Sequence, residues 1–124
     1  MKRGLPAVLV VDADPDTLTL LREWLTAAGW DVADAATCGD APMDVNLVLI
    51  DLAFPRRGDA ASSQRRIPPV YAGVPVLALS ATFHASVAPW GEVARSLGVA
   101  GVLPKPIRRE ALVAAVRHLS GARP

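Results

Sequence analysis

Four reactive side chains each follow a separate apolar run of this sequence: Asp12, Asp51, Ser80 and Lys105. For a single aspartate at the end of a strand, a cap or turn role is the commoner explanation, but that explanation fits four such groups much less well. In an open parallel sheet, ligands bind outside the carboxyl ends of the strands. Because four separate strands each end in a reactive group, the four residues predict one shared site at that edge.

The four apolar runs have the length and the β-branched content of strands that are buried on both faces. They cover residues 7–11, 45–50, 74–79 and 99–103. Residues 30–34 alternate between apolar and polar side chains, which predicts a fifth strand at an edge of the sheet.

Helical patterns lie between some of these strands. Asp14 and Pro15 are typical of an N-cap and a first helical residue, and the helix that follows is expected to end at Gly29. A further helix is expected within residues 86–97, and apolar residues at helical spacing predict a last helix over residues 112–119. The alternation of strands and helices indicates a doubly wound α/β domain with a parallel sheet.

Two connections differ from an ordinary crossover. Residues 36–44 are fewer than the roughly ten to twelve that a crossover with its helix needs. Residues 54–73 contain three prolines, and only residues 59–67 have room for a short helix. We therefore expect a shortened second crossover and an irregular third one, which leave one sheet face for a partner or a second subunit to cover.

Composition limits the classes of protein to consider. The length of 124 residues fits one domain, residues 1–124, with a core of about residues 7–119. The net charge of +1 provides no strongly basic surface, so no direct nucleic-acid partner is expected. Cys38 is the only cysteine, which excludes an intrachain disulfide and indicates a reducing compartment. No apolar run is long enough to cross a membrane, and we expect a cytoplasmic protein.

The segments around the four reactive residues resemble the signatures of the response-regulator receiver domain. Asp12 lies in a segment similar to the acidic opening of that family, and Asp51 is followed four residues later by a proline, as in the phosphoacceptor strand. Ser80 precedes an alanine as in the switch strand, and Lys105 lies in a similar closing Lys-Pro signature. The match extends over residues 7–119 and implies a CheY-like, flavodoxin-like sheet in the order 2-1-3-4-5.

The resemblance also implies a role for each of these residues. Asp51 is expected to take a phosphoryl group from a phosphohistidine on a sensor histidine kinase or a phosphotransfer protein. Lys105 is expected to pair with a phosphoryl oxygen and to hold Asp51 in the resting state, and Ser80 to bind the phosphoryl group in the switching step. The peptide between Lys105 and Pro106 resembles the one that is cis in the family.

A receiver domain normally uses Mg²⁺, held here by Asp12, Asp51 and the backbone carbonyl of Ala53. The sequence departs from the family at Ala13, where a metal-binding carboxylate is usual. Asp14 is a candidate substitute, although its expected role is to cap the helix. Because the loss of a ligand should lower metal affinity by at least the roughly 10–100-fold typical of outer-shell changes, we expect Mg²⁺ binding to be weak or absent.

Two functions stay open on the sequence. One is a phosphotransfer receiver, at most catalysing its own phosphorylation and dephosphorylation, that signals through contact with a downstream protein. The other is a pseudo-receiver that acts as an interaction module without phosphorylation, which Ala13 favours. A flavin- or nucleotide-binding enzyme is disfavoured because residues 12–15 form no glycine-rich phosphate loop. A second copy of the chain, in a homodimer, is a further candidate partner beside the downstream protein, and the sequence leaves open whether the chain is a whole protein or an excised domain.

Overall fold

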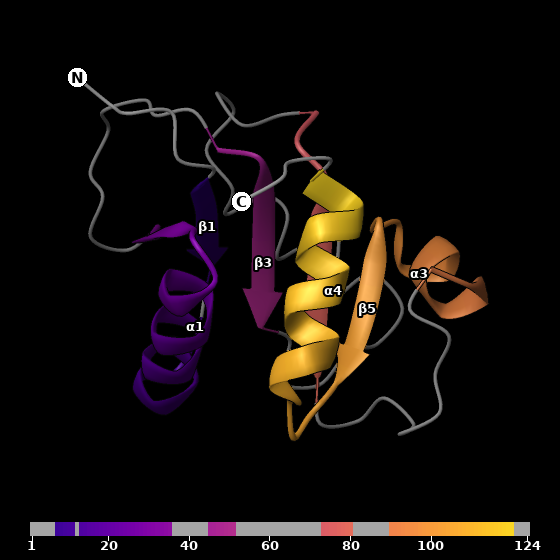
Figure 1. The fold of residues 1–124 in the computed structure, drawn as a ribbon. Coiled ribbons are helices and arrows are strands. Elements are labelled where there is room, and N and C mark those ends of the chain that lie inside the picture. The colour runs from indigo at the N-terminus through magenta and orange to yellow at the C-terminus, as the bar shows by residue number, and fades with distance from the viewer. Residues whose placement is uncertain (1–6, 12, 36–44, 52–72, 81–89, 121–124) are drawn as a thin grey trace.

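A five-stranded parallel sheet forms the centre of the computed structural model, which describes residues 7–11, 13–35, 45–51, 73–80 and 90–120. The strands lie in the order β2-β1-β3-β4-β5, and β1, β3 and β5 point the same way in Figure 1. Their bounds are β1 Ala7–Val11, β2 Asp31–Asp34, β3 Leu47–Asp51, β4 Val76–Ser80 and β5 Gly101–Pro104. The predicted doubly wound fold and strand order are confirmed.

Alternating side chains of the strands build two separate cores, one on each face of the sheet. On one face, Leu49 and its neighbours pack against helices α1 (Pro15–Ala27) and α4 (Arg109–Ser120). On the other face, Ile50 and its neighbours pack with Ala94 of helix α3 (Glu92–Leu97). Burial on both faces explains why the central strands are continuously apolar in sequence.

Strands β3, β4 and β5 each end one residue later than their apolar runs predicted, whereas β1 and β2 end at Val11 and Asp34 as predicted. Asp51 is paired with Leu79 in the β3–β4 ladder, and Ser80 is paired with Pro104 in the β4–β5 ladder. Both polar residues are therefore the last residues of their strands, whereas the sequence placed each just after its strand. The pairing uses backbone groups and does not depend on side-chain polarity, so hydrophobicity alone misplaces the strand ends.

The helices agree with the sequence where they can be compared. Helix α1 begins at Pro15 after the Asp14 cap, and the left-handed Gly29 (φ 99°) follows its end. Of the predicted helix over residues 86–97, the described part is helical from Glu92. The two unusual crossovers, residues 36–44 and 54–72, lie outside the described residues, as does the predicted helix over 59–67. No helix in the described part of the chain has the length and apolar character of a membrane span.

Replacing Leu21 with alanine should destabilise the fold far more than the same change at its neighbour Leu20. Leu21 is fully buried in the core beneath α1, whereas Leu20 is 41% exposed. We expect Leu21→Ala to lower the free energy of unfolding by ~2–5 kcal/mol. Leu20→Ala should change it by only about 0.5 kcal/mol, as is usual at surfaces. Urea unfolding of both variants checks this, and equal losses would contradict the burial of Leu21 in the core beneath α1.

Candidate functional site

The carboxyl ends of β3, β4 and β5 bring the predicted site residues to one edge of the sheet. Asp51 is the last residue of β3, and Ser80 is the last residue of β4. Lys105 follows directly after β5, and its backbone N–H donates to the Ser80 carbonyl oxygen at 2.9 Å. The peptide between Lys105 and Pro106 is cis, as the resemblance implied. The three residues therefore come together because their strands are parallel neighbours.

The centre of the site is an ion pair between Asp51 and Lys105. The Lys105 ammonium Nζ lies 2.7 Å from Asp51 Oδ1 and donates a hydrogen bond to Oδ2 at 2.8 Å. The Asp51 side chain is only 8% exposed and that of Lys105 is 23% exposed. Removing one partner from such a partly buried pair leaves the other charge without compensation, which is costly. Asp51 is thus a nearly buried carboxylate whose charge is balanced by one flexible ammonium.

Ser80 ends the strand next to Asp51, but its side chain starts from the opposite face of the sheet. Its side chain is fully buried. Successive side chains of a strand alternate between faces, so Ser80 shares the face of Ala78, while Asp51 shares the face of Leu49. The hydroxyl group therefore belongs to the strand next to Asp51 and begins from the opposite face of the sheet.

The start of helix α1 supplies two further polar groups. Asp14 caps the helix, and its carboxylate accepts hydrogen bonds from the Thr17 N–H at 3.3 Å and the Thr17 hydroxyl at 2.5 Å. Lys105 Nζ donates to Thr17 Oγ1 at 3.4 Å and lies 3.8 Å from Asp14 Oδ1. The predicted cap is confirmed, and it touches the lysine of the site. Thr17 was not identified from sequence, although its place three residues after the cap is the capping-box position.

The electrostatics of Asp14 reflect this arrangement. The hydrogen bond from the Thr17 hydroxyl is the largest influence that holds the pKa of Asp14 below its usual value. The Thr17 N–H and the positive charge of Lys105 act in the same direction, while desolvation opposes them. The ionised form of Asp14 is therefore the one that the folded protein stabilises.

The described residues supply only part of a magnesium site. Asp51 and Asp14 both carry hard oxygen donors, but both surround the Lys105 ammonium. Within the described ranges, no group of three or more His, Cys, Asp or Glu side chains is placed to hold a metal ion. Ala13 packs its methyl group against the core on the α1 face. Two further predicted ligands, Asp12 and the Ala53 carbonyl, lie outside the described residues.

The lowered pKa of Asp14 predicts how its contribution to stability depends on pH. A depressed pKa stabilises the fold above the unfolded value of 3.8, and this stabilisation is lost as the pH falls through the lower value of the folded state. Asp14→Asn keeps a cap but removes the charge. The difference in unfolding free energy between wild type and Asp14→Asn should be largest at neutral pH and shrink as the pH falls below 3.8.

Urea unfolding at several pH values measures this difference. Asp16→Asn is the control, since Asp16 lies in the same first turn and its side chain makes no hydrogen bond or ion pair with another described residue. A difference for Asp14→Asn that stays constant or grows on acidification would refute the assignment.

Comparison with known proteins gives the family. The family model described as the response regulator receiver domain matches residues 8–117. No curated protein sequence matches this chain.

Solved structures show the same fold at low sequence identity. A response regulator receiver protein from Burkholderia phymatum shares 24% identity at a TM-score of 0.69, over 95% of this chain and 97% of that one. A receiver protein from Sinorhizobium medicae shares 24% identity at 0.65, over 99% and 100%. Chemotaxis protein CheY4 of Vibrio cholerae shares 19% identity at 0.65, over 94% and 99%. With the family match across most of its length, this chain belongs to the response regulator receiver domain family.

Proposed function

We propose that this receiver domain accepts a phosphoryl group on Asp51 from a histidine kinase or a phosphotransfer protein and signals through protein–protein contact. The observation that carries the proposal is the Asp51–Lys105 pair, a carboxylate at the carboxyl edge of the sheet with both oxygens within 2.8 Å of one ammonium. Receiver domains in general act with kinases and downstream partners in two-component signalling.

The transfer needs a nucleophile and a cation that can move from the carboxylate to the phosphoryl group as the phosphoryl group arrives. One Asp51 oxygen attacks the phosphorus of a phosphohistidine, so a P–O bond forms while the P–N bond breaks. The imidazole nitrogen leaves with the bonding electrons and takes a proton from water. Lys105 Nζ, released from one carboxylate oxygen, pairs with a phosphoryl oxygen. Water later hydrolyses the acyl phosphate, which restores the Asp51 carboxylate and releases inorganic phosphate.

Ser80 is proposed to donate its hydroxyl hydrogen bond to a phosphoryl oxygen. Its position at the end of the strand that pairs with β3 next to Asp51 supports this role. Lys105 is tied to the same strand end through its hydrogen bond to the Ser80 carbonyl. A shift of Ser80 would therefore also move Lys105, which begins the turn that leads into α4.

Mg²⁺ is proposed to bind weakly, through Asp51, Asp12 and the backbone carbonyl of Ala53. When bound, it would neutralise charge on the phosphoryl oxygens. The structure argues against Asp14 as a strong ligand, because its Oδ1 and Oδ2 already accept hydrogen bonds from Thr17. A site with fewer carboxylates than usual keeps more of its coordination for water.

The second candidate is a pseudo-receiver that binds partners without phosphorylation. Ala13 favours it, since it removes a carboxylate from the acidic pocket. In that case the Asp51–Lys105 pair is a structural ion pair that holds the ends of β3 and β5 together.

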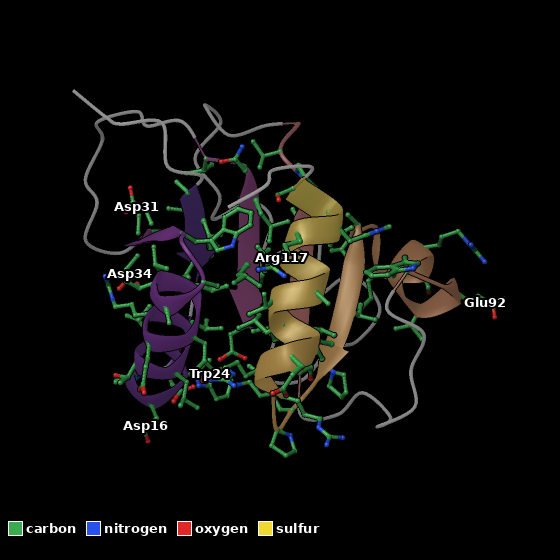
Figure 2. The ribbon with its side chains drawn as sticks, in the orientation of Figure 1. Asp16, Trp24, Asp31, Asp34, Glu92 and Arg117 are labelled. Atoms are coloured by element: carbon green, nitrogen blue, oxygen red, sulfur yellow. The ribbon has the colours of Figure 1, made fainter. Side chains whose placement is uncertain are left out.

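Phosphorylation by a small donor separates the two candidates. With phosphoramidate and Mg²⁺, wild type should gain the mass of one phosphoryl group, and Asp51→Asn should gain none, because it lacks the nucleophile. The matched control is Asp34→Asn, which changes an aspartate that also ends a strand, but at the β2 edge beside α1 (Figure 2). Intact-mass spectrometry makes the measurement. No gain in wild type would favour the pseudo-receiver, and a gain that Asp51→Asn retains would show that Asp51 is not the acceptor.

Restoring the missing carboxylate should strengthen metal binding. Ala13→Asp is expected to raise the affinity for Mg²⁺ by at least ~10-fold, because it adds an oxygen ligand and a negative charge to the pocket. Ala114→Asp adds the same charge on the exposed surface of α4 and should leave the affinity unchanged. NMR titration with Mg²⁺ gives both constants, and equal affinities for wild type and Ala13→Asp would show that position 13 does not limit the site.

A further inference from the structure

The Lys105 ammonium is held from two sides in this structure. Asp51 contacts it from the end of β3, with its two oxygens at 2.7 and 2.8 Å. Thr17 contacts it from the first turn of α1, with Oγ1 at 3.4 Å, and Asp14 Oδ1 lies 3.8 Å away. An ammonium group has three donors and no acceptor, so one group can serve both sides. Among the described residues, the second side is built entirely from the helix cap.

The Thr17 hydroxyl can link the Lys105 ammonium to the Asp14 carboxylate, because a hydroxyl group both donates and accepts hydrogen bonds. Its O–H donates to Asp14 Oδ1, which leaves the oxygen lone pairs to accept from Lys105 Nζ. Such a chain of hydrogen bonds strengthens each member, because every group polarises the next. Asp14 is fixed in turn by the Thr17 backbone N–H. The negative charge of Asp14 thus reaches Lys105 through one hydroxyl group.

Thr17 is also more rigid than Lys105, so it can hold the Lys105 ammonium in one place. A lysine ammonium sits on a flexible four-carbon stem, and a β-branched threonine has few rotamers. Thr17 is half-buried at the start of α1, while Asp14 beside it is exposed. The threonine therefore limits how far the ammonium can move away from the Asp51 carboxylate at the end of β3.

We propose that Thr17 is a positioning residue that ties the Lys105 ammonium to the α1 cap and so determines where the ammonium stands when Asp51 carries a phosphoryl group. Once the phosphoryl group forms, the ammonium loses part of its contact with the carboxylate, and Thr17 remains as its second anchor. The part that concerns transfer rests on the proposed function; the part that concerns the resting ammonium does not.

The resting position is tested by NMR of the Lys105 ε-methylene group in unphosphorylated protein. Thr17→Val removes the hydroxyl and keeps the side-chain shape, so the Lys105 ε signals should shift and the two ε protons should become equivalent. Thr17→Ser keeps the hydroxyl and should restore the wild-type signals. Thr19→Val is the matched control, because the Thr19 hydroxyl lies in the same helix and bonds the Pro15 carbonyl at 2.9 Å instead of the lysine.

The reaction is tested by the rate of phosphorylation with phosphoramidate under the same conditions. Thr17→Val should slow the gain of the phosphoryl group by about 10-fold, the scale of loss for partners that orient a reacting group, while Thr17→Ser and Thr19→Val should stay near wild type. If Thr17→Val unfolds, Thr17→Ala replaces it in both experiments.

The outcomes separate this inference from the proposed function. Lys105 signals that stay at the wild-type position in Thr17→Val, or that move equally in Thr19→Val, overturn the proposal. An unchanged rate in Thr17→Val also overturns it, for the transfer step. If wild type takes no phosphoryl group, the proposed function fails, and the Lys105 signals still decide whether Thr17 positions the ammonium.

Discussion

The ion pair between Asp51 and Lys105 is the interaction on which the rest of the site depends. A carboxylate that is only 8% exposed needs a nearby positive charge, and the sole contact that supplies one in the described structure comes from Lys105, 54 residues further along the chain. The pair forms only if β3, β4 and β5 are parallel neighbours that end at the same edge. The apolar sheet therefore positions the reactive side chains, because it determines where β3, β4 and β5 end.

Both faces of the sheet contribute to this placement in different ways. The core beneath α1 and α4 holds the helix whose cap reaches Lys105, so the buried Leu21 and Leu25 position Thr17 indirectly. The core beneath α3 packs the other side of β3, β4 and β5 and keeps their register. Lys105 connects the end of β4 to the start of α1. Its backbone N–H donates a hydrogen bond to the carbonyl of Ser80, and its ammonium contacts Thr17.

The sequence predicted the parts of the structure that follow from local pattern. Continuous apolar runs indicated buried parallel strands, and Asp14 with Pro15 indicated a helix start; both are confirmed. The ends of β3 and β4 were placed too early, because backbone pairing continues through Asp51 and Ser80 whatever their polarity. Thr17 was not identified, since its contact with Lys105 joins residues 88 apart in sequence and leaves no local signal beyond the capping position. The metal ligands and the transfer chemistry stay predictions that came from the family resemblance.

Amide NMR of the protein with Mg²⁺ and beryllofluoride, which mimics a phosphoryl group on an aspartate, tests whether Asp51 is a phosphoacceptor. We expect saturable shifts at Asp51, Ser80, Lys105 and Thr17 that are absent in Asp51→Asn. Spectra that do not change at millimolar concentrations of both reagents, or that change equally in Asp51→Asn, would contradict a phosphoacceptor at Asp51 and leave the ion pair as a structural feature of an interaction module.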